Sequence, residues 1–389
     1  MKAAVLTAVA TAAALSAAAL PASAASTDAV ALRPVVRAAS GAAVPGQYIV
    51  TLKPGVSARA AATSLGVAPL HVYDSAVHGY AARLTAAQLL RVQRDPSVAM
   101  IEEDQVARIA EEAGAADVQP TDLYGLDRID QRRLPLSGTY SFNTKAAGVH
   151  VYVIDTGIAP GHPQFGGRAN KVYDAFGGTG QDCHGHGTHV AGTVGGATFG
   201  VAKRVRLHGV RVLDCSASGS VSGIIAGINW VRTHQIRPAV ANLSLRAGYS
   251  QTLNNATANL AGSGVAVAVA AGNDGIAACK VSPASTANVI TVGAVDRSDT
   301  RPYWSNFGTC VDVFAPGVNI MSTIPGGTAV FSGTSMASPH VAGVMALYKA
   351  KNGNVGTAKV NSWIKDTATT GLVKAPNGSP NKLLFKATL

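Results

Sequence analysis

The sequence predicts a three-layer α/β domain with a mostly parallel central sheet, preceded by a small α+β domain. Between about residues 149 and 351, apolar runs alternate with helix-like stretches, as is typical of parallel strands joined by crossover helices. The 389 residues are 47% hydrophobic and only 14% charged, so the chain can bury a large core. Near Val44 an alanine-rich stretch gives way to strand and helix signals, which marks the start of the smaller domain.

The first stretch has the features of a secretory signal peptide. Residues 1–24 contain one lysine, a short apolar region and a Pro-Ala-Ser-Ala end that is typical of a cleavage site. A membrane anchor is the weaker alternative, because the stretch is short and mostly alanine. We therefore expect a secreted, extracellular protein without a membrane span.

Two segments follow before the large domain. Residues 25–43 are rich in alanine and are expected to be a flexible leader. Residues 44–112 are expected to form the small α+β domain, in which Thr85 caps an amphipathic helix. The other expected elements of this domain are strands at 47–52, 78–84 and 98–106 and a helix at 58–65.

The large domain is expected over residues 117–389. Each of its strands is an apolar run of the kind found in buried parallel sheets. The expected strands are Val149–Ile154, Val205–Leu213, Ala239–Leu245, Val265–Ala271 and Val289–Val295, and the expected helices are Ser220–His234, Ser250–Leu260 and Ser335–Lys351.

The stretch Ser332–Gly343 places one hydroxyl, that of Ser335, at the start of a helix. A helix N-terminus carries a partial positive charge and would stabilise an oxyanion that forms beside this serine. A lone Gly-Thr-Ser is more often an ordinary N-cap, so a catalytic interpretation requires partners for Ser335.

Two other stretches could supply a base and a carboxylate that orients it. The apolar run Val151–Ile154 leads to Asp155 and a glycine turn, at the strand end where ligands collect in open α/β sheets. The stretch Asp182–Gly192 is a glycine-rich turn that enters a helix and carries His186. A hydroxyl, an imidazole and a carboxylate are the parts of a Ser-His-Asp triad.

These motifs resemble the three signature segments of the subtilisin-like serine proteases. The segments are Asp-Thr-Gly at 155–157, His-Gly-Thr-His at 186–189 and Gly-Thr-Ser-Met-Ala at 333–337, and they occur in the family's order. The resemblance begins near Leu123, extends almost to the C-terminus, and is strongest to the proteinase K and aqualysin branch. It implies a full precursor, in which the small domain is an inhibitory propeptide.

The resemblance also implies a role for each motif residue. Ser335 would be the nucleophile, His186 the general base and acid, and Asp155 the carboxylate that orients the imidazole. His189 lies one helical turn after His186, so we expect it to be a packed or hydrogen-bonded helix residue. His184 has no support from the family motif.

An oxyanion hole is expected at the end of the strand Val265–Ala271. The family's Ala-Ala-Gly-Asn pattern places Asn273 there as the donor, assisted by the backbone N–H of Ser335. Ordinary turn chemistry is the alternative interpretation of Asn-Asp after Ala-Gly.

By the same resemblance, two strand edges should align a peptide substrate through main-chain pairing. The family usually has glycine where Arg246 and Ala247 stand, and this difference could narrow or charge the pocket for the residue before the scissile bond. The expected edge residues are Ser244, Leu245 and Arg246 on one side and Ser218 and Gly219 on the other.

Four cysteines in a secreted chain suggest two disulfides, for which three pairings are possible. Their spacings and the aqualysin-like context together favour Cys183–Cys215 and Cys279–Cys310. A zinc site at Cys183, beside His184 and His186, lacks a Cys-x-x-Cys partner and is the weaker alternative.

The resemblance implies that catalysis needs no cofactor, and it implies calcium as a structural ion. Calcium requires several oxygen ligands on ordered loops. Scattered surface carboxylates are the alternative interpretation. The two candidate sets are Asp312 with the carbonyls of Ala287 and Val289, and Asp127, Asp130 and Gln131, with Ser137 and Thr139.

The net charge of +11 and the isoelectric point near 9.6 do not indicate nucleic-acid binding, because the basic residues are scattered rather than clustered.

The expected partners are polypeptide substrates and the protein's own propeptide. The propeptide would act as chaperone and inhibitor and be removed by self-cleavage within about 109–118. We expect a monomer with no added module after Leu389. The alternatives are a non-catalytic binding protein that retains the fold, or an esterase, although Ser335 lacks the G-x-S-x-G elbow.

Overall fold

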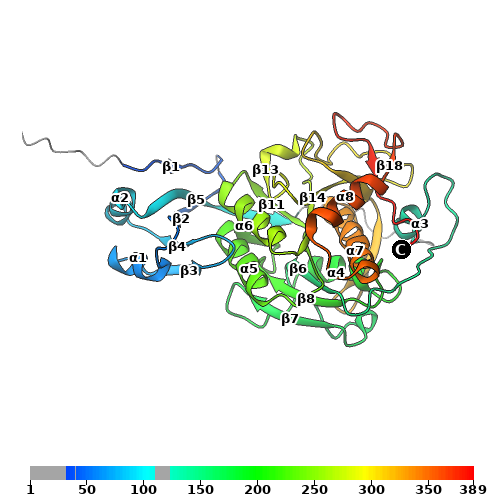
Figure 1. Cartoon of the computed structure of the whole chain (residues 1–389), viewed down its shortest axis with the longest axis horizontal. Coiled ribbons are helices and arrows are strands. Elements are labelled where there is room, and N and C mark those ends of the chain that lie inside the picture. The colour runs from blue at the N-terminus through cyan, green and yellow to red at the C-terminus, as the bar shows by residue number, and fades with distance from the viewer. Residues whose placement is uncertain (1–31, 40, 110–122) are drawn as a thin grey trace, which may run out of the picture. The chain divides into compact units, whose positions relative to one another are not determined.

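The computed structural model of this chain describes residues 32–39, 41–109 and 123–389 (Figure 1). The expected signal peptide lies outside the described residues, as does all of the expected cleavage window except Ile109. Within the described ranges, no helix has the length and apolar character needed to cross a membrane.

Among the described residues, the large domain is built on a nine-stranded sheet with the strand order β18-β19-β15-β14-β12-β10-β6-β8-β7. All neighbouring strands run parallel except β18 and β19, which are antiparallel. The strands are β6 His150–Asp155, β7 Ala169–Asp174, β8 Arg206–Arg211, β10 Ala239–Leu243, β12 Ala266–Ala270, β14 Ile290–Val295, β15 Val313–Pro316, β18 Thr369–Thr370 and β19 Lys382–Leu383.

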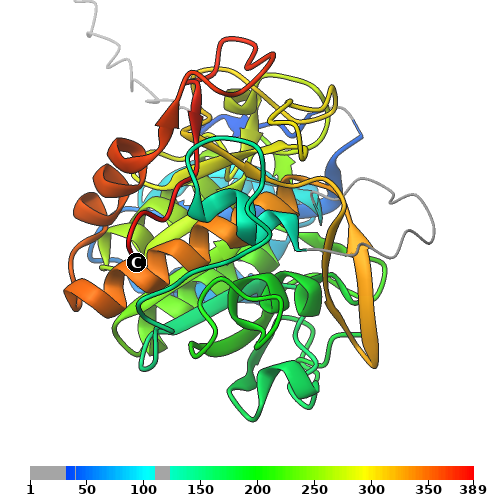
Figure 2. The same cartoon turned by 90° about the vertical axis from the view of Figure 1, so that its right-hand side faces the viewer.

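Helices cover both faces of this sheet, which confirms the predicted three-layer fold (Figure 1). On one face lie α4 His186–Gly195, α7 Thr334–Asn352 and α8 Thr357–Thr367; on the other lie α5 Val221–His234 and α6 Gln251–Gly262. Figure 2 shows α7 and α8 together, coloured orange to red. The shorter elements are α3 Tyr124–Asp130, η1 Pro163–Phe165, β9 Ser218–Ser220, β11 Leu245–Gly248, η2 Ala278–Lys280, β13 Val281–Ser282, β16 Ile320–Ile324 and β17 Gly327–Phe331.

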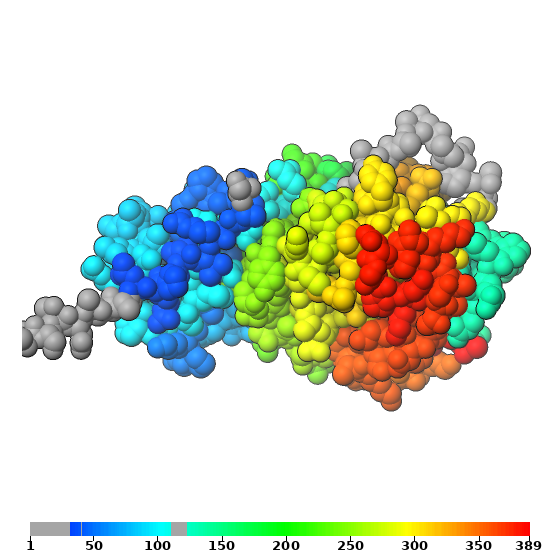
Figure 3. All heavy atoms as spheres, turned by 90° about the horizontal axis from the view of Figure 1, so that it is seen from above, coloured from blue at the N-terminus to red at the C-terminus, as the bar shows by residue number. Residues whose placement is uncertain are grey.

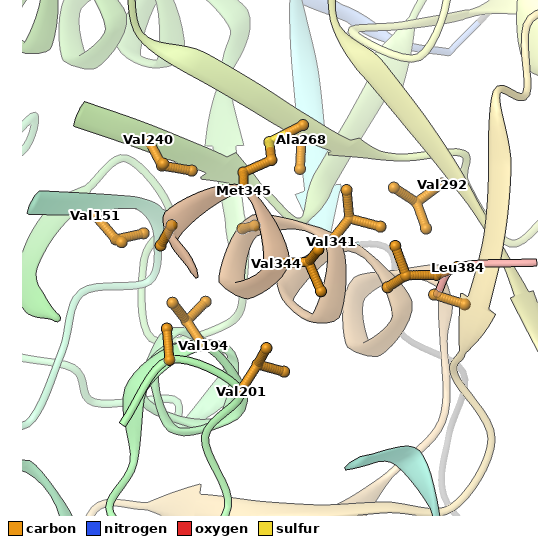
Figure 4. Close-up of a cluster of buried hydrophobic side chains, with 14 of the residues drawn as sticks. Val151, Val194, Val201, Val240, Ala268, Val292, Val341, Val344, Met345 and Leu384 are labelled. Carbon is orange, nitrogen blue, oxygen red and sulfur yellow. The ribbon is translucent and has the colours of Figure 1, made fainter. Parts of the chain in front are cut away.

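The core follows from the alternation of side chains along each strand. In β6, Val151 and Val153 pack with α4 and α7, whereas Tyr152 and Ile154 pack with α5 and α6. Figure 4 shows the first of these layers, with the side chains of α7 between those of the sheet and those near α4. Both faces of the sheet are therefore buried, as the continuous apolar runs in the sequence predict.

The small domain is a mostly antiparallel sheet with two helices; only β1 pairs in parallel among its described strands. The strand order is β5-β2-β4-β3, and β1 also pairs with β5. Thr85 forms a capping box with Gln88 at the start of the second helix, as its sequence predicts. The elements are β1 Val35–Val36, β2 Ala43–Leu52, α1 Ala58–Ser64, β3 Pro69–Tyr73, β4 Gly79–Arg83, α2 Ala86–Arg94 and β5 Val98–Ile109.

Two buried carboxylates of β5 attach the small domain to the large one. Glu102 accepts hydrogen bonds from the Ser250 hydroxyl at 2.8 Å and the Thr252 N–H at 3.2 Å, at the N-terminus of α6. Asp104 accepts from the N–H of Ser222 at 3.0 Å and from its hydroxyl, at the N-terminus of α5. In Figure 3 the blue and cyan atoms of the small domain lie against the green and yellow-green atoms of these helices. A carboxylate at a helix N-terminus satisfies unpaired N–H groups and complements the helix dipole.

Two expectations about the N-terminal part of the chain require correction. The leader is not flexible throughout, because Val35–Val36 pair with β5 and Arg37 forms an ion pair with Glu103. The last strand of the small domain extends to Ile109 rather than Val106, because its end pairs with two strands of the large domain.

Removing the two capping carboxylates should weaken the attachment of the small domain. In a Ser335→Ala background, which lacks the expected nucleophile, the Glu102→Ala/Asp104→Ala variant should lose about 2–4 kcal/mol in the free energy of unfolding. Thermal and urea unfolding of the full chain would measure the loss. Glu103→Ala is the matched control, since Glu103 pairs with an arginine that is 73% exposed and should contribute less than about 1 kcal/mol. Equal losses in the two variants would contradict the capping role.

Candidate active site

Asp155 and His186 are in direct contact. Asp155 is the last residue of β6 and His186 is the first residue of α4, so the end of a strand meets the start of a helix. The Nδ1–H of His186 donates to Oδ1 of Asp155 at 2.7 Å, and both side chains are fully buried. A buried carboxylate in this position selects the imidazole tautomer that carries its proton on Nδ1.

The residues around this pair fix its geometry. The N–H of Gly187 donates to the Thr156 hydroxyl at 2.9 Å, and that hydroxyl donates to Asp182 at 2.9 Å. A Cβ at position 187 would clash with the carbonyl of Gly157, so only glycine permits this close approach. The glycines of the two motifs therefore have a packing role beside the histidine and the aspartate.

Asp182 organises the turn that carries His186, and our sequence analysis did not identify it as a functional residue. Its carboxylate accepts hydrogen bonds from the backbone N–H groups of His184, Gly185 and Thr188 and from the hydroxyl groups of Thr156 and Thr188. The signal was present in the sequence, because an aspartate before a glycine-rich turn often accepts from nearby backbone groups.

Ser335 lies in the first turn of α7 and makes two reciprocal hydrogen bonds with Ser244, which follows β10. Its hydroxyl donates to the Ser244 carbonyl at 3.0 Å, and its own carbonyl accepts from the Ser244 hydroxyl at 2.8 Å. In a regular helix the carbonyl of residue 335 would accept the N–H of residue 339, but that residue is Pro339, which has no N–H. The Ser244 hydroxyl therefore takes the place of the missing donor.

A buried amide extends this network. The Nδ2 of Asn242 donates to the Ser244 hydroxyl at 2.9 Å, and its Oδ1 accepts from the Ser338 hydroxyl at 2.7 Å. All three of these side chains are fully buried. Helix α7 also packs against α4, which begins at His186. Ser335 and the Asp155–His186 pair therefore belong to neighbouring elements.

Asn273 is hydrogen-bonded to Thr334, the residue that precedes Ser335. Its Oδ1 accepts from the N–H of Thr334 at 3.0 Å and from the Thr334 hydroxyl at 2.8 Å. Its Nδ2 is buried and has no hydrogen-bond partner within the described part of the chain. The amide group therefore has one end held and a donor left over, which is the arrangement that an oxyanion donor requires.

Both predicted substrate edges are paired, and their partner is β5 of the small domain. Leu245 and Arg246 of β11 lie opposite Ile109 and Arg108 in antiparallel register. On the other side of the same strand, Ser218 lies opposite Arg108 and Gly219 opposite Ala107. The end of β5 thus lies between the two edges as an extended peptide would.

Arg246 and Ala247 stand where the resembled family usually has glycine, and their environments differ. Arg246 forms an ion pair with Asp274, with 2.5 Å between Nη2 and Oδ1, and both side chains are about one-third exposed. Ala247 is buried and lies opposite Ser282 of β13. The Arg246 side chain therefore extends from the predicted substrate edge to the segment that carries Asn273.

Two other histidines near the site, His189 and His340, are buried helix residues. His189 lies within hydrogen-bond distance of the carbonyls of Ile320 and Ala329 and stacks on Phe331, which confirms the expectation of a packed helix residue. Burial lowers the pKa of His189 to about 3 and that of His340 to about 4, so both are neutral at physiological pH.

The two disulfides favoured by the resemblance are present. Cys183–Cys215 connects the turn before His186 to the segment that leads into β9. Cys279–Cys310 connects two loops of the large domain. Among the described residues no cysteine is free, so a zinc site at Cys183 is excluded.

The first candidate set for calcium fits a hard cation. Asp312, Ala287 and Val289 line one cavity of about 500 Å³. The same cavity is lined by Asn361, whose buried Oδ1 has no hydrogen-bond partner among the described residues. Lys365 places its ammonium 3.7 Å from Oδ1 of Asp312, so a positive charge already lies beside the carboxylate. Burial raises the pKa of Asp312, a penalty that a nearby cation offsets.

The second candidate set does not fit as it stands. Asp127 accepts hydrogen bonds from the N–H and hydroxyl of Ser137 and from the N–H of Gly138. Asp130 accepts two from Ser141, and Gln131 accepts one from Ser137. These carboxylates organise their own loop, which is a sufficient role for them without an ion.

Comparison with known proteins identifies two matching families. Residues 146–383 match the family described as Subtilase family, and residues 47–110 match the one described as Peptidase inhibitor I9. The Extracellular serine proteinase of Thermus sp. (strain Rt41A) is 46% identical over 374 residues, which cover 88% of this chain and 90% of the relative. Alkaline serine exoprotease A of Vibrio alginolyticus is 48% identical over 320 residues, which cover 82% of this chain and 60% of the relative. The crystal structure of a cold adapted subtilisin-like serine proteinase superposes with a TM-score of 0.68 at 47% identity, covering 69% of this chain and 99% of the other.

The reciprocal bonds between Ser335 and Ser244 can be tested through the proline. Ser244→Ala leaves the buried Ser335 carbonyl without a donor and should cost about 1–3 kcal/mol in the free energy of unfolding. Adding Pro339→Ala supplies an N–H in the same helix and should recover part of the loss. Urea unfolding in the Ser335→Ala background would measure both variants. A double variant no more stable than Ser244→Ala alone would show that the unpaired Ser335 carbonyl does not cause the loss of stability.

Proposed function

This chain belongs to the subtilase family, and we propose that it is a secreted serine endopeptidase that cleaves peptide bonds through Asp155, His186 and Ser335. The observation that carries the proposal is the position of β5, which pairs with both proposed substrate edges and places Ile109 opposite Leu245. Leu245 directly follows Ser244, the hydrogen-bond partner of Ser335. A substrate strand in the same register would bring its next carbonyl beside the serine.

In the proposed reaction, His186 accepts the proton of Ser335 through Nε2 while its Nδ1–H remains bonded to Asp155. The serine oxygen attacks the peptide carbonyl, and the resulting oxyanion accepts hydrogen bonds from Nδ2 of Asn273 and the backbone N–H of Ser335. His186 then gives the proton to the leaving amine, and water hydrolyses the acyl-enzyme. Loss of one oxyanion donor in a subtilisin costs about 10²–10³ in kcat, so Asn273 should contribute a large part of the rate.

Polypeptides are the proposed substrates, because the recognition surface consists of two strand edges. Main-chain pairing gives affinity with little dependence on side chains. Arg246 and its ion pair with Asp274 lie on one of these edges and would restrict the adjacent side-chain pocket. The reaction needs no cofactor, and we expect the enzyme to act as a monomer.

The small domain is proposed to act as chaperone and inhibitor and then to be removed. Its strand β5 pairs with both proposed substrate edges, and its carboxylates at 102 and 104 cap two helices of the large domain. We propose self-cleavage within residues 109–118, near the start of that window, because Ile109 lies opposite Leu245. The proposed segments are a signal peptide at 1–24, a propeptide at 44–112 and a mature domain at 117–389.

Substitution of the nucleophile gives a direct test. Ser335→Ala should reduce peptide hydrolysis by at least about 10⁴-fold and leave the chain uncleaved after secretion, since removal of one triad member removes most of the chemical catalysis. Hydrolysis of a chromogenic peptide and N-terminal sequencing would measure the two effects. A wild-type enzyme that retains residues 44–109 on the active molecule would contradict the propeptide assignment, and an active Ser335→Ala variant would contradict the triad.

We also propose that calcium binds at Asp312 with the carbonyls of Ala287 and Val289, in competition with Lys365. Calcium should raise the melting temperature by a few degrees, and a chelator should reverse the shift. Lys365→Met should increase this calcium-dependent shift because the competing ammonium is gone, whereas Asp312→Asn should abolish it. Differential scanning calorimetry would measure these shifts, with Lys359→Met as the control on the same helix. An equal shift in wild type and Asp312→Asn would place the ion elsewhere.

A further inference from the structure

We propose that Asn306 is a positioning residue. It holds the backbone on both sides of Asn273 so that Nδ2 of Asn273 points at the reacting carbonyl. The inference rests on the proposed function, because it assigns Asn306 to the support of the oxyanion donor. Asn306 is fully buried and lies in the segment between β14 and β15.

The hydrogen bonds of Asn306 join it to residues on both sides of Asn273 in the chain. Its Nδ2 donates to the Ala271 carbonyl at 2.8 Å, and its backbone N–H donates to the Gly272 carbonyl at 2.9 Å. Its Oδ1 accepts from the N–H groups of Asp274 at 3.1 Å and Ile276 at 3.0 Å. One side chain and its own backbone thus hold the residues on both sides of the oxyanion donor.

This support is needed because the segment has left the sheet. Strand β12 ends at Ala270, and Gly272 turns the chain with a φ of 100°, which glycine adopts readily and other residues rarely do. Backbone polar groups that are buried outside a sheet need other partners, and Asn306 supplies them. A Cβ at position 272 would clash with Nδ2 of Asn306, so the glycine and the asparagine fit each other.

Asn306 is itself anchored to the sheet. The hydroxyl of Ser305 accepts from the N–H of Ala294 in β14 at 3.0 Å, and the Ser305 carbonyl accepts from Arg301 at 2.6 Å. From the other side, Thr334 of α7 holds Oδ1 of Asn273 and accepts the N–H of Gly272 at 3.0 Å. Asn273 is therefore fixed through its backbone by Asn306 and through its side chain by Thr334.

A loss of this support should affect the transition state more than substrate binding. The oxyanion exists only after attack on the carbonyl, so a misplaced Nδ2 lowers kcat and leaves the main-chain pairing that determines KM. Misplacement by about 1 Å can cost about 10² in rate. We therefore expect Asn306→Ala to lower kcat by about 10²-fold with a small change in KM.

A double-mutant cycle separates this role from a purely structural one. The variants are Asn306→Ala, Asn273→Ala and the double variant, expressed as full chains and, where self-processing is slow, matured by a trace of wild-type enzyme. If Asn306 acts through Asn273, Asn306→Ala should cost about 10²-fold in kcat in the wild-type background and less than about threefold when Asn273 is already alanine. A peptide aldehyde forms an oxyanion with the serine when it binds. Its affinity for the Asn306→Ala variant should therefore fall together with kcat.

Asn381→Ala is the matched control, because Asn381 bonds both the N–H and the carbonyl of Val373 in another loop and should reduce stability without lowering kcat. If Asn306→Ala does not fold, Asn306→Asp retains the Oδ1 acceptor, removes the donation to Ala271 and should give an intermediate loss. An equal loss of kcat in both backgrounds, or a rise in KM alone, would overturn the inference. Absence of Ser335-dependent hydrolysis in the wild type would instead refute the proposed function.

Discussion

The architecture of the site depends on the pair of hydrogen bonds between Ser335 and Ser244. They join the start of α7 to the end of β10, and each serine supplies one hydroxyl and one carbonyl. Pro339 makes the pair necessary, because it removes the helical donor for the Ser335 carbonyl. The proposed substrate edge begins at the next residue, Leu245. Under the proposed function, the same pair therefore sets the Ser335 hydroxyl in register with any strand that binds there.

Inhibition by the small domain follows from this register. Its strand β5 lies between β9 and β11 and also pairs with β2 of its own domain. Under the proposed function, β5 therefore occupies the place of a substrate strand. Glu102 and Asp104 lie on the same strand and cap α6 and α5, which form the face of the large domain that the small domain covers. Under the proposed function, the segment that must be removed for activity also stabilises two helices of the enzyme.

Elements with a strong local signal were predictable from sequence, and those defined by distant contacts were not. The buried parallel strands appeared as apolar runs, and Asp155, His186 and Ser335 followed from motifs. Strand β7 was missed because it is a partly exposed edge strand, whereas α8 has buried Val360 and Ile364 four residues apart and could have been found. The roles of Asn306 and of the second candidate calcium set could not be predicted from sequence. Both depend on hydrogen bonds between residues that are not neighbours in the chain.

The central claim is that Ser335 is the activated hydroxyl of this protein. Treatment of the mature enzyme with a fluorophosphonate, followed by peptide mass mapping, tests it without knowledge of the substrate. One adduct per chain is expected, on Ser335, with labelling blocked while residues 44–109 remain bound and lost in His186→Ala. Labelling of another residue, or equal labelling of wild type and His186→Ala, would contradict the account.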